Sequence, residues 1–107
     1  MEIEERTEGN VTILELKGRM AGGEDDELLR EEVEHLVDAG RLNIVLDMAN
    51  VPGIDSAGLG EILHCHIKVT KKGGTLKLVN VNERLRGLLT QTRIAWVHDD
   101  LLSDPSP

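Results

Sequence analysis

Residues 45–60 read VLDMANVPGIDSAGLG, and this stretch decides the fold. It begins inside an apolar run, Leu42 to Met48, which predicts a β-strand covered on both faces. A turn over Ala49 to Ile54, marked by Pro52-Gly53, comes next. Asp55 and Ser56 then open a helix that we expect to run to about Lys72. The stretch is therefore a buried strand, a loop and a helix N-terminus in direct succession.

Upstream of this stretch, the pattern predicts a strand pair and another helix. Ile3 to Leu16 holds two short strand candidates around a Gly9-Asn10 turn, with one shift in the apolar phase after Ile13. Glu24 to Ala39 should be a helix that ends at Gly40. Its apolar residues recur at three- and four-residue spacing and form one stripe: Leu28, Leu29, Val33, Leu36 and Val37.

Downstream, strands and helices continue to alternate. Gly73-Gly74 ends the second helix, and Thr75 to Val79 alternates as a strand. Asn82 is placed to cap a third helix that carries Leu85, Leu88 and Leu89. The last expected features are a short strand over Ile94 to Val97, at most one helical turn over Asp99 to Leu102, and a frayed tail over Ser103 to Pro107.

This order predicts one α/β domain over residues 1–107. Alternating strands and helices favour a sandwich with a mixed, mainly parallel sheet of four to five strands and three to four helices. We expect the helices to pack mostly on one face of the sheet. Apolar residues make up 39% of the chain and Trp96 is its one aromatic residue, so the core must consist of aliphatic side chains.

Charge and composition exclude several classes of function. The 12 basic and 20 acidic residues give a net charge of −8, which argues against direct nucleic-acid binding. The longest apolar run, Ile94 to Val97, is far shorter than the roughly 20 residues of a membrane helix. The acidic start, with Glu2, Glu4 and Glu5, does not resemble a signal or transit peptide. We therefore expect a cytoplasmic protein without membrane insertion.

We expect the chemistry of this protein at Asp55 and Ser56. In open α/β sheets, ligands and partners meet the loops at the carboxyl ends of strands. A helix N-terminus offers free N–H groups and partial positive charge, which suit a phosphate on Ser56. Gly58 and Gly60 are expected to leave an exposed shoulder that another protein's backbone could approach. Asp and Ser are also ordinary helix caps, and the two interpretations are compatible if Asp55 caps while Ser56 faces outward.

At this point the sequence resembles a family. Residues 54–60, Ile-Asp-Ser-Ala-Gly-Leu-Gly, look like the signature of STAS domains, the bacterial anti-sigma factor antagonists and their relatives. Residues 73–80, Gly-Gly-Thr-Leu-Lys-Leu-Val-Asn, match the segment of that family in which a strand follows two glycines. The order of elements agrees from Val11 to Val97.

The resemblance implies a mechanism. Ser56 would be the phosphorylation site, and Asp55, Ala57, Gly58, Leu59 and Gly60 would form the edge that meets a partner. The unphosphorylated chain would bind an anti-sigma factor serine kinase and free the sigma factor. Phosphorylation would release the chain, and a PP2C-type phosphatase would reset the cycle. The chain would need no cofactor and no catalytic machinery of its own.

Two departures from the family pattern bear on the partner. The family often has Gly-Glu-Leu-Asp after the second strand, whereas this chain has Gly18-Arg19-Met20-Ala21. Both acidic positions are lost, on a surface that faces partners in the family. Ala57 replaces a common Ser or Thr, so Ser56 is the one hydroxyl at the site. These departures keep a second hypothesis open, a scaffold subunit of a stress-sensing complex or an accessory protein of a lipid transporter.

Metal-binding and enzymatic interpretations are weaker. His64, Cys65 and His66 are consecutive, and consecutive helical residues diverge by about 100°, so they cannot converge on one ion. We expect His66 to be a core or half-buried residue, Cys65 to be a small buried one, and His64 to lie on the solvated side. Four acidic residues of the first helix are expected on its solvent-exposed face and not in a catalytic carboxylate pair of a hydrolase: Glu31, Glu32, Glu34 and Asp38. No metal site is expected, and the chain is not expected to be an enzyme.

Overall fold

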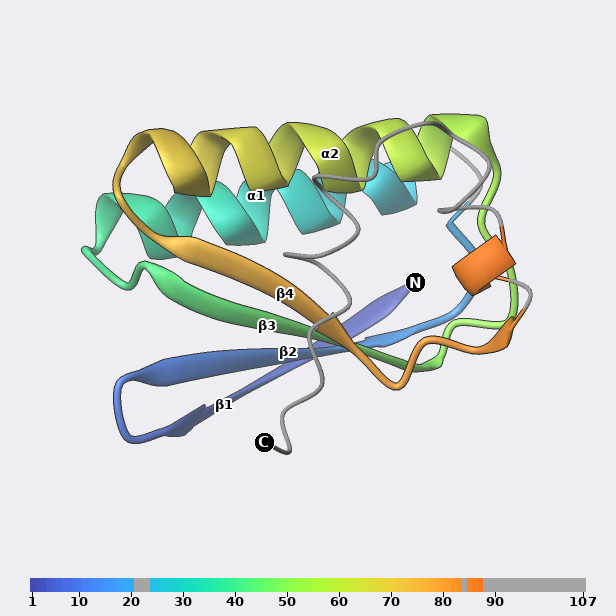
Figure 1. Cartoon of the computed structure of the whole chain (residues 1–107), viewed down its shortest axis with the longest axis horizontal. Helices are drawn as coiled ribbons and strands as arrows, with labels where there is room; N and C mark the ends of the chain where they lie inside the picture. Colours follow the sequence, from blue (N-terminus) through green and yellow to red (C-terminus); the bar gives the residue numbers. More distant parts are fainter. Residues whose placement is uncertain (21–23, 84, 88–107) are drawn as a thin grey trace.

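Four strands form one sheet in the spatial order β1-β2-β3-β4 (Figure 1). The computed structural model describes residues 1–20, 24–83 and 85–87. The antiparallel hairpin of β1 and β2 is followed by parallel pairing of β2 with β3 and of β3 with β4. The strands are β1 (Glu2–Glu8), β2 (Val11–Lys17), β3 (Asn43–Asn50) and β4 (Thr75–Val79). The predicted mixed, mainly parallel sheet is confirmed.

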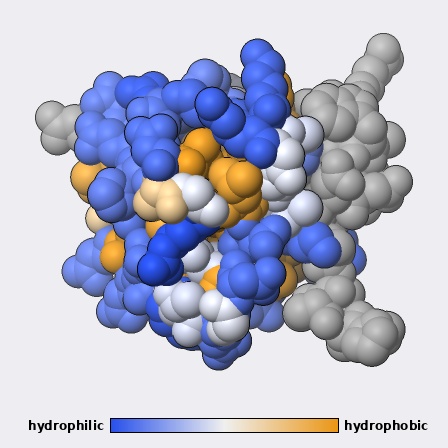
Figure 2. Space-filling model, turned by 90° about the vertical axis from the view of Figure 1, so that its left-hand side faces the viewer, coloured by the Kyte–Doolittle hydropathy of each residue, from blue (hydrophilic) through white to orange (hydrophobic). Residues whose placement is uncertain are grey.

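Two long helices cover the same face of this sheet, α1 (Glu24–Asp38) and α2 (Ser56–Lys71) (Figure 1). Each one links two parallel strands, as the alternating pattern predicts. The apolar layer lies between helices and sheet, and its fully buried members include Leu14, Leu46, Val33, Ile62 and Val69. Figure 2 views the end at which both helices terminate, where orange hydrophobic atoms gather inside a largely blue hydrophilic surface.

A third helix begins where the sequence predicts it. Glu83 and residues 85–87 are helical, and the side-chain Oδ1 of Asn82 accepts a hydrogen bond from the backbone N–H of Leu85 at 2.8 Å. Asn82 is therefore the cap. Leu88, Leu89, the expected strand Ile94 to Val97, the turn Asp99 to Leu102 and the tail Ser103 to Pro107 lie outside the described residues. Within the described part of the chain, no helix is long and apolar enough to cross a membrane.

Three details of the sequence prediction are wrong. β3 continues to Asn50 instead of ending at Met48, because Asn50 still pairs with Lys17 and its carbonyl accepts from Gly18 N–H at 3.0 Å. β3 alternates between buried and half-buried residues up to Met48, whereas its apolar run predicted a strand covered on both faces. Leu28 is 46% exposed, although its spacing assigned it to the buried stripe of α1. The predicted change of apolar phase within β2 is confirmed, since Leu14 and Leu16 lie in the core while Val11 and Ile13 line a groove elsewhere on the sheet.

The two glycines after α2 permit a tight return to the sheet. Gly73 has a φ of +82°, in the left-handed region that favours glycine. At Gly74, a Cβ would lie 2.7 Å from the Cβ of Leu42 and 2.9 Å from Cγ1 of Val69. The chain therefore crosses closely beneath the end of α2 before entering β4, which explains why this position carries no side chain.

Candidate functional site

Asp55 is the N-cap of α2. Its backbone is extended (φ −101°, ψ −175°), and its Oδ1 accepts a hydrogen bond from the N–H of Gly58 at 2.9 Å. The predicted combination of a capping Asp55 and an outward-facing Ser56 is confirmed, since Ser56 is exposed as the first residue of α2. Ser56 contributes no side-chain hydrogen bond to the network of the described residues. Its hydroxyl is thus presented to solvent at the positive end of the helix.

The segment that follows β2 pairs with the loop that precedes Ser56. Met20 and Ile54 form an isolated parallel bridge. Around it, the N–H of Met20 donates to the carbonyl of Gly53 at 3.1 Å, and the N–H of Asp55 donates to the carbonyl of Met20 at 3.0 Å. The Met20 side chain is completely buried. These contacts join the backbone after β2 to the loop immediately before Ser56.

Gly58 does not form the exposed shoulder that the sequence suggested. It is buried, and a Cβ at this position would lie 2.5 Å from the carbonyl oxygen of Met20 and 2.8 Å from Cγ1 of Ile54. The absent side chain lets α2 pack against the residues after β2. An approach by another protein's backbone is therefore not the reason for glycine here.

The other residues of the signature divide between surface and core. Leu59 is 8% exposed and packs inward, whereas Ala57 and Gly60 are exposed. A Cβ at Gly60 would meet nothing within 4 Å. Of the residues predicted to face a partner, the structure brings Asp55, Ala57 and Gly60 to the surface beside Ser56. Gly58 and Leu59 can shape that surface only from beneath.

Arg19 lies beside the same loop. Its side chain is exposed, and its Nε and Nη2 lie 3.7 and 3.8 Å from the point that a Cβ of Gly53 would occupy. The guanidinium therefore extends over the bare backbone of Gly53, three residues before Ser56. The charge-reversed position noticed in the sequence belongs to the surroundings of Ser56.

The histidines and the cysteine of α2 do not join this site. His66 is 4% exposed and Cys65 is fully buried, as predicted, and His64 is exposed. Burial raises the pKa of the Cys65 thiol to about 12, so it is an inert core residue. Among the described residues, no group of three or more His, Cys, Asp or Glu side chains is arranged to hold a metal ion.

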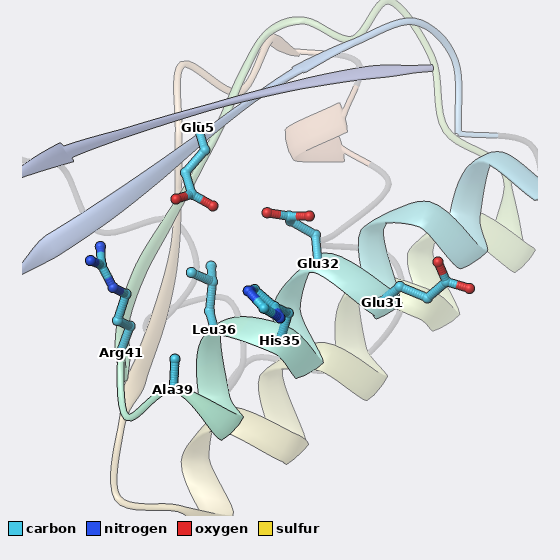
Figure 3. Close-up of a pocket in the computed structure, with 7 residues that line it drawn as sticks. All are labelled: Glu5, Glu31, Glu32, His35, Leu36, Ala39 and Arg41. Atoms are coloured by element: carbon cyan, nitrogen blue, oxygen red, sulfur yellow. The ribbon is translucent and has the colours of Figure 1, made fainter.

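A separate groove of about 680 Å³ opens between β1 and α1 (Figure 3). In this view the carboxyl groups of Glu5 and Glu32 point toward each other across the groove. Their hydrogen bond raises the pKa of the Glu32 carboxyl, with burial as the second cause. The groove is also lined by Glu31, His35, Leu36, Ala39 and Arg41, and by no residue of the Asp55 to Gly60 segment.

The sequence missed this carboxyl pair because Glu5 comes from a distant strand. Glu31 and Asp38 are exposed, as their assignment to the wet face of α1 predicts. Glu34 is only partly exposed and accepts a hydrogen bond from the Lys68 ammonium, which holds the pKa of Glu34 below its ordinary value. Glu32 and Glu34 thus pair with residues of neighbouring elements, Glu5 of β1 and Lys68 of α2.

Comparison with known proteins supports the resemblance. A family model described as STAS domain matches residues 2–101. TM1081 of Thermotoga maritima, a putative anti-sigma factor antagonist, has 24% identity and a TM-score of 0.84, with 97% of this chain and 88% of that chain covered. SpoIIAA of Bacillus, in its phosphorylated form, has 15% identity and a TM-score of 0.74, with 98% and 92% covered.

The same fold occurs within a larger membrane protein. The murine anion transporter Slc26a9 has 17% identity and a TM-score of 0.72 over 91% of this chain, but only 16% of the transporter chain is covered. At these identities the structures show a shared fold. A search of curated proteins gave no match.

Proposed function

Since this chain belongs to the STAS domain family, we propose that it is an anti-sigma factor antagonist that works by switching partners. In its unphosphorylated form it binds an anti-sigma factor serine kinase in the cytoplasm and frees the sigma factor. Phosphorylation on Ser56 releases it, and a PP2C-type phosphatase restores the binding form. The observation that carries this proposal is the exposed Ser56 hydroxyl, directly after a capping Asp55, on the STAS fold.

Asp55 caps α2 while Ser56 is available for modification, and this arrangement suits a reversible switch. The N-terminal cap comes from Asp55, so α2 keeps its cap when Ser56 is modified. A phosphate adds about −1.5 to −2 charge at pH 7 at this point. Phosphorylation therefore changes the charge of the surface while leaving the helix in place.

The expected effect on a partner is large enough to switch it. A partner packed against Ser56 would have to desolvate the phosphate and accommodate its charge. A loss of about 2–3 kcal/mol in binding free energy weakens an association roughly 30- to 150-fold. The bridge between Met20 and Ile54 ties the loop that leads to Ser56 to the backbone that follows β2.

The residue assignment can be tested with a purified anti-sigma factor kinase from the native host and ATP. We expect mass spectrometry to find one phosphate, on Ser56, and Ser56→Ala to remain unlabelled. Thr70→Ala is the matched control, because Thr70 is an exposed hydroxyl near the other end of α2, and it should be labelled like the wild type. Labelling of Ser56→Ala at the wild-type level would refute the assignment.

A second candidate function is a scaffold role, as a subunit of a stress-sensing complex or of a transporter assembly. Two observations favour it, the Arg19 that replaces an expected acid and the likeness to a domain of Slc26a9. Light scattering on native complexes distinguishes the two functions. A megadalton particle or a stable transporter complex, unchanged by Ser56→Asp, indicates the scaffold. A small complex with a kinase that Ser56→Asp abolishes indicates the switch.

A further inference from the structure

Arg19 is held in place by the backbone on either side of it. Gly18 N–H donates a hydrogen bond to the carbonyl of Asn50 at 3.0 Å. The N–H of Met20 donates to the carbonyl of Gly53, and the carbonyl of Met20 accepts from the N–H of Asp55. The buried Met20 side chain faces the core, while Arg19 is exposed. These backbone hydrogen bonds therefore position the Cα atom of Arg19, while its exposed side chain can change rotamer.

The charge of Arg19 is not used within the described part of the protein. Several other cations there pair with carboxylates: Arg6, Lys17, Arg30 and Lys68. No ion pair to a described carboxylate is found for Arg19. Its guanidinium rests instead over Gly53, on the loop that leads to Ser56. A guanidinium presents several donors in a planar fork, a geometry suited to phosphate oxygens.

Arg19 and Ser56 are also close in the chain path. They flank the residues joined by the 3.0 Å hydrogen bond from Asp55 N–H to the Met20 carbonyl. Two Cα–Cα steps of about 3.8 Å, this bond, and about 4 Å of backbone within Met20 and Asp55 put the two Cα atoms at most about 15 Å apart along the path. The straight line between the two Cα atoms is shorter than this path. The side chains of arginine and phosphoserine together have about ten bonds between Cα and their terminal atoms, which is enough for the guanidinium to reach the phosphate.

We infer that Arg19 is the intramolecular counter-charge for a phosphate on Ser56: its guanidinium turns from Gly53 to the phosphoryl oxygens and holds them on the chain's own surface. This inference rests on the proposed function only for the identity of the modified residue. The consequence is that phosphorylation here also withdraws an exposed cation from the surface offered to partners.

The test uses the full chain with phosphoserine placed at position 56 during translation, so that no kinase is required. The second proton of a phosphoserine dissociates with a pKa of about 6, and phosphorus NMR follows it through a pH titration. A unit charge in contact with the phosphate, at about 4 Å in water, lowers that pKa by about 0.8. We expect Arg19→Gln to raise the measured value by about this amount and Arg19→Lys to raise it by less.

Lys71→Gln is the matched control. It removes the same charge from the last residue of α2, roughly 22 Å from Ser56 at 1.5 Å per residue. That separation exceeds the screening length of about 8 Å at physiological salt, so the titration should be unchanged. A second readout needs no variant at position 19: the Nε–Hε resonance of Arg19 in the wild-type chain should move when phosphoserine replaces Ser56.

Equal phosphate titrations in the wild type and Arg19→Gln, with an unmoved Nε–Hε resonance, would overturn the inference. The same result together with weaker kinase binding by unphosphorylated Arg19→Gln would reassign Arg19 to the partner interface. Failure of every kinase to modify Ser56 would count against the proposed function but would not affect this titration. The two ideas can therefore fail separately.

Discussion

The carboxylate of Asp55 accepts a hydrogen bond from the backbone N–H of Gly58 at 2.9 Å, so Asp55, and not Ser56, caps the start of α2. Both residue types are good helix caps, so the sequence alone allowed either to fill the role. Because Asp55 fills it, the hydroxyl of Ser56 is free to be modified. This division separates the stability of the site from its chemistry.

Asp55→Ala should lower the free energy of unfolding by about 1 kcal/mol, within the usual range of about 0.5–2 for a lost cap. Asp55→Asn should recover most of that loss, because an Asn side chain caps a helix as well as Asp does. Ser56→Ala should change the stability by less than about 0.5 kcal/mol, as for an exposed side chain. Urea denaturation of the three variants measures all of this. Equal losses in Asp55→Ala and Asp55→Asn would mean that charge, and not capping, is what Asp55 contributes.

Gly58 and Gly60 should respond in opposite directions to the same substitution. Gly58→Ala places a Cβ 2.5 Å from the Met20 carbonyl oxygen and should destabilise the fold by about 1–3 kcal/mol. Gly60→Ala adds a Cβ in open space on the same helix and should stabilise it by about 0.5–1 kcal/mol. Equal effects in urea denaturation would contradict the packing assigned to Gly58.

Local patterns were sufficient to predict the strands and helices of the described residues, with small differences at their ends. The apolar run before residue 49, the Pro-Gly turn and the Asp-Ser helix start define a strand, a loop and a helix without reference to the rest of the chain. They also pointed to Asp55 and Ser56 as the candidate site, because a helix N-terminus after a buried strand lies at the edge of the sheet. Asn82 and the Gly73-Gly74 pair followed from capping rules alone.

What the sequence could not provide was contact between distant segments. The burial of Gly58 depends on Met20, which lies on the other side of α1 in the chain. Leu28 is 46% exposed although its spacing places it on the apolar stripe, so the extent of the buried face of α1 had to come from the structure. The pairing of Glu32 with Glu5 requires the position of β1 relative to α1. Each is a tertiary relationship for which periodicity carries no signal.

Glu32 should make the stability depend on pH in a defined direction. Its pKa is raised in the folded state by Glu5, so between the ordinary value of about 4.5 and the raised one the native state binds more protons than the unfolded state. Stability must then fall as the pH rises through this window. The charged groups facing the pair are Glu31, His35 and Arg41.

Glu32→Gln should remove this dependence and make the protein more stable than the wild type at pH 7.5, with the difference shrinking toward pH 5. Urea denaturation at several pH values measures it. Glu31→Gln is the control, since Glu31 is an exposed carboxylate on the same helix and lines the same groove. If the curves of Glu32→Gln and the wild type remain parallel from below the ordinary value of 4.5 up to pH 7.5, the carboxyl pair does not form.

Cys65 should be inert until the protein unfolds. Its folded pKa of about 12 lies above the ordinary value of 9.0, so the folded state retains a proton that the unfolded state loses. Between these values the free energy of unfolding should decline by up to about 1.4 kcal/mol per pH unit because of this residue. Denaturation between pH 8.5 and 11 should show a shallower slope for Cys65→Ala than for the wild type. Rapid reaction of the native thiol with iodoacetamide at pH 8 would contradict its burial.

The central claim, that a phosphate on Ser56 decides which partner is bound, is tested most directly by one binding measurement. Isothermal titration of the anti-sigma factor kinase from the native host is carried out with the unmodified chain and with the chain carrying phosphoserine at position 56. The account predicts a Kd at least about 30-fold higher for the phosphorylated chain, equivalent to about 2 kcal/mol. Equal Kd values for the two forms would contradict it and would leave Ser56 as no more than the first residue of α2.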